Sequence, residues 1–296
     1  MSDPQNVSFL GLGAMGAPMA RRLAEAGHRV TIFNRSSARV EQWLADNPAH
    51  EVRVATSPAD AADGADAVLT CVGSDDDLAD VVLGPGGVFS RLRRGGVFID
   101  HTTVSVKIAR QIAVEARDKE ILCVDAPVTG GQAGAEKGSL SALCGGSAKA
   151  IEAARPIIGA YAARITHVGK AGAGQSTKMC NQICIAGIVA GLSEAIRFGQ
   201  GARLDMDKVY EGISGGAAQS WQMDNRWKTM VEGRFDFGLA VDWMRKDLGL
   251  ALDEARNIGV GLPVAALVDQ FFSEVQALGG GRDDTSALIR RLPKKS

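Results

Sequence analysis

A lysine and an asparagine lie three residues apart in the segment Gly172–Gln182 (GAGQSTKMCNQ). At helical spacing Lys178 and Asn181 share one face, which is otherwise apolar through Ile185 and Val189. A lysine on a buried face needs a partner or a chemical role. Removal from water disfavours its charged form and would make it a usable acid and base near neutral pH. The alternative is a lysine at a helix start that extends to solvent.

A second polar cluster follows a predicted strand in the segment Asp125–Gly131 (DAPVTGG). Gly130 and Gly131 expose backbone N–H groups and Thr129 adds a hydroxyl, a combination that suits a carboxylate. A plain glycine turn without a ligand is the simpler alternative. Another candidate is Lys246, which heads the apolar run KDLGLAL; the alternative is an ordinary helix-surface pair with the aspartate after it.

A glycine-rich turn near the N-terminus has the pattern of a site for a dinucleotide cofactor. The apolar run Val7–Leu10 ends in a Gly-x-Gly-x-x-Gly sequence, and a helical segment follows at once. This context predicts a dinucleotide site, because the glycines allow a tight turn, a close approach to the pyrophosphate and helix–strand packing. The helix N-terminus then faces the anion. The predicted cofactor contacts are Gly11, Leu12, Gly13, Ala14, Met15 and Gly16.

The end of the second predicted strand, Arg29–Phe33, indicates which nicotinamide cofactor is bound. NAD enzymes usually place Asp or Glu there to accept from the ribose 2′-hydroxyl. This chain has the neutral Asn34, followed by Arg35 and Ser36. Arg35 would pair with a 2′-phosphate through its fork of donors. We therefore predict NADP in preference to NAD, with NAD as the second choice; an ordinary surface arginine is the alternative.

Alternating strand-like and helical segments in the first half of the chain must position these groups. Short apolar runs predict strands, and segments of helical period lie between them, as at Pro18–Ala26 and Val106–Lys119. This alternation is typical of a parallel, doubly wound α/β sheet that is covered on both faces. The predicted strands are Val7–Leu10, Arg29–Phe33, Ala67–Val72, Val97–Asp100, Leu122–Asp125, Leu140–Cys144 and Ile165–His167.

The pattern changes after Gly174, where residues 178–200 predict one long apolar helix and no convincing strand follows. We therefore predict a dinucleotide-binding domain at residues 1–168. An all-α domain led by the long helix follows at 169–296 and serves substrate binding and dimerisation. A helix this apolar is buried, and a second subunit could cover part of it, which favours a homodimer or homotetramer.

Composition and charge exclude several classes of protein. The 296 residues suit two domains, and a formal net charge of -1 without a basic block disfavours nucleic acid as a partner. We expect no signal peptide, because the N-terminus lacks a basic segment followed by an apolar one. We expect no membrane span, because we find no apolar run of about 18 residues. Five cysteines without C-x-x-C spacing indicate a reduced, cytoplasmic protein without a metal site.

The run Asp75–Asp77 after Ser74 predicts an acidic helix start; a metal site is the alternative.

Four motifs together resemble the β-hydroxyacid dehydrogenase family. That family includes 3-hydroxyisobutyrate dehydrogenase, tartronate semialdehyde reductase, glyoxylate/succinic semialdehyde reductases and threonate dehydrogenase. The motifs occur in the family's order and span nearly the whole chain. They are GLGAMGAPMA at 11–20, DAPVTGG at 125–131, GAGQSTKMCNQ at 172–182 and KDLGLAL at 246–252.

The resemblance implies a Rossmann-type α/β domain, an all-helical domain and an active site between them. It implies that Lys178 is the catalytic residue, that the turn Thr129–Gly131 binds the substrate carboxylate and that Asn181 orients the substrate. It adds two cofactor contacts, Thr103 near the nicotinamide and Lys246 from the helical domain. One departure is Thr129 itself, because the family motif usually has Ser at this position.

The expected reaction is hydride transfer between NADP(H) and a small β-hydroxy acid or the matching semialdehyde or keto acid, with Lys178 as general acid and base. Three alternatives stay open. The first is an imine or ketone reductase acting on substrates without a carboxylate, although such enzymes usually lack the lysine. The second is a non-catalytic NADP-binding module, and the third is His101 as the general base.

Overall fold

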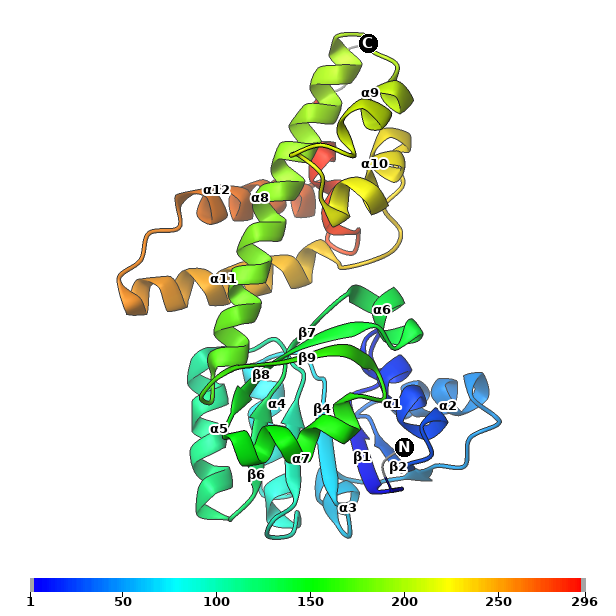
Figure 1. Cartoon of the computed structure of the whole chain (residues 1–296), viewed down its shortest axis with the longest axis vertical. Helices are drawn as coiled ribbons and strands as arrows, with labels where there is room; N and C mark the ends of the chain where they lie inside the picture. Colours follow the sequence, from blue (N-terminus) through cyan, green and yellow to red (C-terminus); the bar gives the residue numbers. More distant parts are fainter. Residues whose placement is uncertain (1–2, 294–296) are drawn as a thin grey trace. The chain divides into compact units, whose positions relative to one another are not determined.

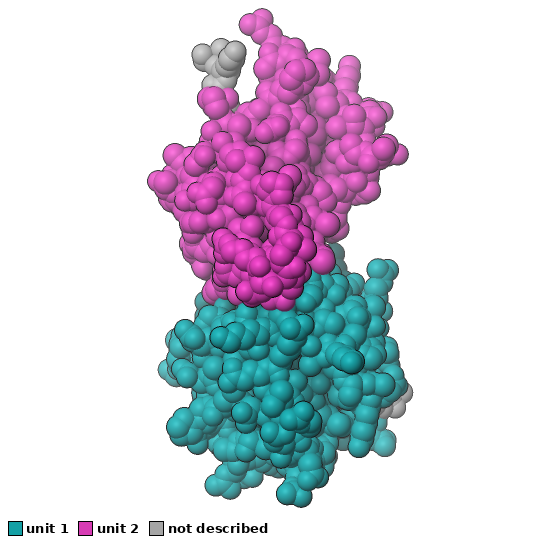
Figure 2. All heavy atoms as spheres, turned by 90° about the vertical axis from the view of Figure 1, so that its left-hand side faces the viewer, with its two compact units in different colours: residues 1–178 teal, residues 179–296 magenta. Residues whose placement is uncertain are grey.

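The computed structural model describes residues 3–293 and divides into two compact units, residues 1–178 and 179–296 (Figure 2). The first unit is a sheet with helices on both faces, and the second consists of helices (Figure 1). One helix, α8, begins in the first unit and continues into the second.

The first unit is built on a single sheet with the strand order β3-β2-β1-β4-β5-β6-β8-β7, and β9 pairs with β8. All pairs among β1 to β6 are parallel, whereas β8 runs antiparallel to β6 and β7 and parallel to β9. The strands are β1 (Asn6–Leu10), β2 (Arg29–Phe33), β3 (Arg53–Val54), β4 (Ala67–Thr70), β5 (Val97–Asp100), β6 (Leu122–Asp125), β7 (Val128–Thr129), β8 (Leu140–Gly146) and β9 (Ala162–Gly169).

Both faces of this sheet are buried under helices. Neighbouring strand residues belong to opposite cores: Phe9 and Ile99 pack on one face, Leu10 and Phe98 on the other. The first core includes side chains of α1, α2 and α7, and the second those of α3, α4 and α5. This explains why the strands are continuous apolar runs. The helices are α1 (Gly16–Glu25), α2 (Ser37–Asp46), α3 (Pro58–Ala62), α4 (Asp75–Leu83), α5 (Val106–Asp118), α6 (Gly131–Lys137) and α7 (Ala148–Ile158).

The parallel strands end at one edge of the sheet, so the loops after β1, β2, β4, β5 and β6 gather there. The chain leaves β1 toward β2 on one side and reaches β4 on the other side. Such a switch in strand order opens a crevice at the carboxyl ends, which is where doubly wound sheets bind ligands. The loops after β1, β2 and β5, which carry Gly11–Gly16, Asn34–Ser36 and Thr103, therefore lie at this edge.

The second unit has two apolar cores along α8. Ala186 and Val189 pack with side chains of α11 and α12, whereas Leu192 and Ile196 pack with side chains of α10. The helices are α8 (Ala173–Gly201), α9 (Met206–Ile213), α10 (Trp221–Glu232), α11 (Val241–Ile258) and α12 (Pro263–Ala277), followed by a 3-10 segment at Thr285–Arg291.

Helix α8 is long and apolar enough to cross a membrane, by length and composition alone, with a mean hydropathy of 1.5 over its most apolar stretch. The prediction concerned an unbroken apolar run of about 18 residues, and in α8 Ser193, Glu194 and Arg197 interrupt the apolar residues. The property is weak evidence for a membrane span, because the core helix of a water-soluble protein passes the same test. Ala186 and Val189 do lie in a protein core.

The predicted fold class is confirmed, and each predicted strand is present. Two strands of two residues each, β3 and β7, escaped prediction because neither is long enough to show a period. In the described part of the chain β9 is the last strand, and only an isolated bridge between Ala240 and Asp284 follows it.

Candidate active site

The glycine-rich turn between β1 and α1 is tightly packed at two of its three glycines. Gly11 has a φ of +101°, and a Cβ there would overlap the carbonyl oxygen of Cys71. A Cβ on Gly16 would overlap the carbonyl oxygen of Gly11. In contrast, a Cβ on Gly13 would meet no atom of the described residues within 4 Å, its two chain neighbours aside. The fold itself therefore demands glycine at positions 11 and 16, whereas Gly13 leaves the loop backbone open to a ligand.

Asn34 joins this turn to the end of β2. Its Oδ1 accepts a hydrogen bond from the Leu12 N–H at 2.9 Å, and its Nδ2 donates to the Ser36 carbonyl at 3.2 Å. No side chain in the described structure caps the N-terminus of α1, and no acidic residue lies in its first turn. The turn and helix thus fit a dinucleotide, because backbone N–H groups and the helix dipole both favour a pyrophosphate there.

Arg35 lies at the edge of this region. Its side chain is 90% exposed, and its Nη1 is 3.0 Å from Oδ1 of Asp77 in the first turn of α4. An exposed pair of this kind contributes little stability. The guanidinium group can therefore turn toward a phosphate at small cost.

Lys178 is buried, with 9% of the residue exposed, and its Nζ donates to the Val128 carbonyl at 3.0 Å. Val128 directly precedes the turn Thr129–Gly131, in which Gly130 and Gly131 have φ values of +126° and +64°. The structure therefore brings the predicted acid–base residue next to the predicted carboxylate site. The alternative of a lysine that extends to solvent is wrong.

Asp125 holds the start of α8 and was not predicted to do so. Its Oδ1 accepts from the Gly172 N–H at 2.8 Å and its Oδ2 from the Gln175 N–H at 3.1 Å. Burial raises the pKa of Asp125 to about 6, against the effect of these hydrogen bonds. Two features of the sequence could have predicted this role. Asp125 stands at the end of a strand, and the later helix begins after Gly172, which has no side chain to cap it.

The loop after β5 carries Thr103, the predicted contact near the nicotinamide, in a half-buried position. Asp100 ends that strand, and its Oδ1 accepts from the Thr70 hydroxyl at 2.8 Å and the Thr102 N–H at 3.0 Å. Its Oδ2 is buried without a hydrogen-bond partner among the described residues. Burial raises the pKa of Asp100 to about 7, despite these hydrogen bonds.

Within the second unit, the predicted contacts Asn181 and Lys246 are joined by a chain of polar side chains. Asn181 Nδ2 donates to Gln182 Oε1 at 2.7 Å, and Gln182 Nε2 donates to Asp247 Oδ2 at 2.8 Å. Lys246 Nζ lies 3.5 Å from Asp247 Oδ1. Because Asp247 is 4% exposed, the pair formed by Lys246 and Asp247 is not an ordinary surface pair.

His101 is a structural residue. Its Nδ1 faces the Ala126 carbonyl at 2.6 Å and its Nε2 faces the Tyr161 hydroxyl at 2.7 Å. The carbonyl can only accept, so Nδ1 carries the proton and Nε2 accepts from Tyr161. Burial lowers the pKa of His101 to about 4. With both nitrogens used inside the fold, His101 has no lone pair left for a substrate.

The acidic run after Ser74 forms the first turn of α4, as predicted, and the Ser74 hydroxyl accepts from the Asp77 N–H at 3.2 Å. Asp75 accepts from the backbone and hydroxyl of Ser105. Within residues 3–293, no cluster of three or more His, Cys, Asp or Glu side chains could hold a metal ion.

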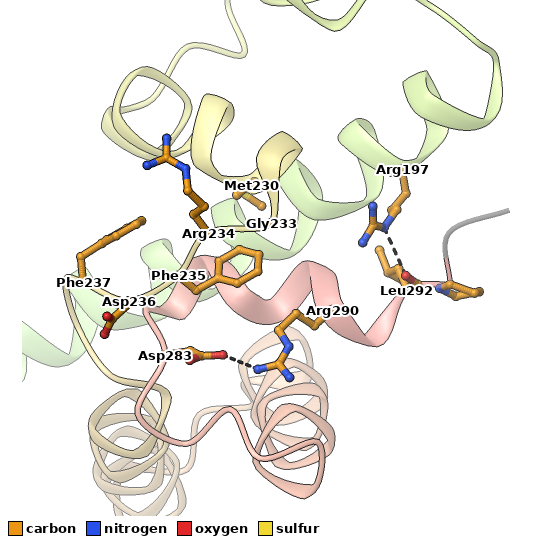
Figure 3. Close-up of a pocket in the computed structure, with 11 residues that line it drawn as sticks. Arg197, Met230, Gly233, Arg234, Phe235, Asp236, Phe237, Asp283, Arg290 and Leu292 are labelled. Carbon is orange, nitrogen blue, oxygen red and sulfur yellow. Dashed lines mark hydrogen bonds and ion pairs between the residues drawn. The ribbon is translucent and has the colours of Figure 1, made fainter. Parts of the chain in front are cut away.

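The second unit also contains a cavity of about 840 Å³ (Figure 3). Two of its arginines have partners: Arg197 donates to the Leu292 carbonyl at 3.1 Å, and Arg290 pairs with Asp283. It includes none of the predicted site residues. The lining residues are Arg197, Met230, Gly233, Arg234, Phe235, Asp236, Phe237, Asp283, Arg290, Leu292 and Pro293.

Two family models cover the chain. Residues 6–169 match the model described as the NAD binding domain of 6-phosphogluconate dehydrogenase. Residues 172–292 match the model described as NAD-binding of NADP-dependent 3-hydroxyisobutyrate dehydrogenase. The doubly wound sheet with its glycine-rich turn and the helical unit that follows therefore define a nicotinamide-dependent oxidoreductase acting on CH–OH groups.

Similar proteins match almost end to end. An uncharacterized oxidoreductase of Shewanella frigidimarina is 54% identical over 97% of this chain and 98% of its own. The 2-(hydroxymethyl)glutarate dehydrogenase of Eubacterium barkeri is 34% identical over 98% of this chain and 95% of its own. The 3-hydroxyisobutyrate dehydrogenase of Mycobacterium tuberculosis, solved with L-serine, is 30% identical with a TM-score of 0.88, covering 98% of this chain and 99% of that one. The chain belongs to the β-hydroxyacid dehydrogenase family, as its four motifs predicted.

Two glycine substitutions should separate cofactor binding from folding. We expect Gly13→Ala to leave the melting temperature nearly unchanged and to weaken NADPH binding roughly tenfold or more, because the methyl group meets no protein atom but obstructs the pyrophosphate. Gly16→Ala should destabilise the fold by about 1–3 kcal/mol or more, because its methyl group overlaps backbone. Thermal melting and NADPH fluorescence titration measure both effects. Equal losses of stability in the two variants would contradict this division.

Asp100 should make stability depend on pH. Its folded-state pKa of about 7 lies above the ordinary 3.8, so its stabilising contribution is complete below pH 3.8 and is lost as the pH rises through about 7. Between pH 5 and 8.5, wild type should lose about 2–3 kcal/mol relative to Asp100→Asn, which keeps the acceptor for Thr70 and Thr102. Denaturant unfolding at several pH values tests this. A difference that stays constant with pH would show that Asp100 is charged throughout.

Proposed function

We propose that this protein transfers a hydride between NADP(H) and a small β-hydroxy acid or the matching semialdehyde or keto acid. The observation that carries the proposal is the position of Lys178, which is buried and hydrogen-bonded to Val128 beside the turn Thr129–Gly131. A proton-transfer group and an anion site are thereby adjacent, as oxidation of a hydroxyl near a carboxylate requires.

Lys178 moves the proton in this proposal. In oxidation, neutral Lys178 accepts the proton of the substrate hydroxyl through Nζ. In reduction, its ammonium group donates a proton to the developing alkoxide and stabilises the charge. The bound nicotinamide supplies the hydride acceptor or donor. The Val128 carbonyl can hold either protonation state of Nζ in place, because both retain an N–H donor.

The turn Thr129–Gly131 binds the substrate carboxylate in this proposal. Thr129 is half-buried and Gly130 and Gly131 are exposed, so the hydroxyl and the backbone N–H groups are within reach of a small ligand. Asn181, one turn after Lys178 on α8, orients the substrate. Its Nδ2 is already bound to Gln182, which leaves Oδ1 to accept from a substrate hydroxyl.

The cofactor in this proposal is NADP, with NAD as a poorer substitute. Gly11–Gly16 holds the pyrophosphate, Asn34–Ser36 holds the adenosine 2′-phosphate, and Thr103 and Lys246 contact the nicotinamide half. The absence of a carboxylate at position 34 and the exposed guanidinium of Arg35 support NADP. So does the NADP-dependent enzyme named in the second family model.

We further propose that the protein works in the cytoplasm as a homodimer or homotetramer. All five cysteines are free thiols, which fits a reducing compartment. Apolar side chains of α8, Ile188 and Phe198, are 37% and 77% exposed, which a second copy could cover.

A substitution at Lys178 tests the proton-transfer role. We expect Lys178→Ala to lower kcat by roughly 10²–10⁴, the usual contribution of a positioned acid or base. Binding of NADPH, measured by fluorescence titration, should stay close to that of wild type. Thr177→Ala is the matched control, because Thr177 lies on the same turn and its hydroxyl donates to the Ala173 carbonyl within α8. A Lys178→Ala enzyme with near-normal kcat would remove the lysine from the mechanism. Assays with carboxylate and non-carboxylate pairs distinguish this reaction from that of an imine or ketone reductase.

Cofactor preference can be tested by converting Asn34 to a carboxylate. Asn34→Asp keeps an oxygen to accept from the Leu12 N–H, adds repulsion toward a 2′-phosphate and offers an acceptor to a ribose 2′-hydroxyl. Combined with Arg35→Ala, it should reverse the preference, lowering kcat/KM for NADP by roughly 100-fold or more. Steady-state kinetics with both cofactors measure this. A wild-type enzyme with a higher kcat/KM for NAD than for NADP would contradict the proposal that Arg35 binds the 2′-phosphate.

A further inference from the structure

Gln175 is the side chain that ties the loop after β5 to α8. It is fully buried and lies one helical turn before Lys178. Its Oε1 accepts from the Val104 N–H at 3.1 Å, and its Nε2 donates to the Thr102 carbonyl at 2.7 Å. These two backbone groups lie on either side of Thr103. The amide therefore holds both peptides that flank the residue proposed to contact the nicotinamide.

The helix that carries Gln175 is itself held at its start. Asp125 accepts from the N–H groups of Gly172 and Gln175, and Lys178 Nζ donates to the Val128 carbonyl. Asp125 ends β6 and Val128 begins β7, only three residues further along. The first turns of α8 and the ends of two strands thus form one hydrogen-bonded frame, to which Gln175 connects the loop of Thr103.

The chemistry of this position demands a neutral amide of this length. The side chain must accept from an N–H and donate to a carbonyl at the same time, in a place from which water is excluded. A leucine would fill the volume but leave both backbone groups unpaired. An ionised glutamate would accept from Val104 but set a second oxygen against the Thr102 carbonyl. An asparagine is one methylene shorter.

We propose that Gln175 is a positioning residue. It sets the distance between the nicotinamide and the substrate carbon whose hydroxyl exchanges a proton with Lys178. This inference rests on the proposed function. Gln175 touches neither substrate nor cofactor; it acts through the Thr103 loop on one side and through α8 on the other. Its loss therefore slows hydride transfer more than it weakens substrate binding, because the reacting atoms are held less well in register.

The experiment compares Gln175→Leu with the control Ser176→Ala, which lies on the same turn and loses only a hydrogen bond to the Gly172 carbonyl. We expect Gln175→Leu to lower kcat by about tenfold to 100-fold, with little change in the KM of the hydroxy acid. The kinetic isotope effect with NADPH deuterated at the transferred position should rise, because hydride transfer becomes more rate-limiting. The Val104 amide should also exchange its hydrogen faster than in the control.

The conservative variant Gln175→Glu adds a second test, the pH dependence of kcat, which should not change if Gln175 only stabilises the fold. In Gln175→Glu, a protonated carboxyl can donate to the Thr102 carbonyl, so its kcat relative to wild type should recover as the pH falls from 8 to 6. The matching ratio for Ser176→Ala should stay flat. A folded Gln175→Leu enzyme with kcat and isotope effect within about twofold of wild type would overturn the proposal.

Failure of the proposed function gives a different result. If wild type oxidises or reduces no hydroxy acid, semialdehyde or keto acid, the proposed reaction is wrong, whatever the variants do. Gln175 is then judged by the fluorescence anisotropy of bound NADPH and by Val104 exchange. Lower anisotropy and faster exchange in Gln175→Leu than in Ser176→Ala support the positioning role, and equal values reject it.

Discussion

The structure depends on the buried carboxylate of Asp125 at the start of α8. The N–H groups of Gly172, just before α8, and of Gln175, in its first turn, donate to it, and the positive end of the helix dipole faces it. Burial opposes the charge and raises the pKa of Asp125 to about 6, whereas the hydrogen bonds from the helix start lower this pKa and so favour the charged form. Without this contact, nothing else in the described first turn would satisfy the N–H groups that bring α8, and with it Lys178, to the end of β6.

Two glycines make that contact possible. A Cβ at Gly145 on β8 or at Gly174 on α8 would overlap the carboxylate oxygens of Asp125. The sheet edge, the helix start and the carboxylate therefore approach to distances that only glycine allows. Gly174 lies in the same motif as Lys178, so part of that motif serves the placement of the helix rather than the chemistry.

The site is consequently made of two kinds of residue. In the proposed function Lys178, Thr129 and Asn181 would contact the substrate. Asp125 and Gln175 instead hold backbone groups through hydrogen bonds. The second kind costs stability, because polar groups are removed from water and must be matched atom by atom. In exchange, the loops that line the proposed site are held at a defined separation before any ligand binds. Hydride transfer is fast only when the donor and acceptor atoms are aligned in this way.

The sequence alone determined the sheet, the glycine-rich turn and the long helix, because apolar runs, helical period and the spacing of three glycines are local patterns. It also indicated Lys178 and the turn Thr129–Gly131 through residue type and family resemblance. It did not show that both ring nitrogens of His101 form hydrogen bonds inside the fold. Nor did it show that Asp125 holds the start of α8 and that Gln175 ties the loop of Thr103 to this helix. Those hydrogen bonds join residues 25 to 73 positions apart, and only the tertiary structure decides which donors meet which acceptors over such separations.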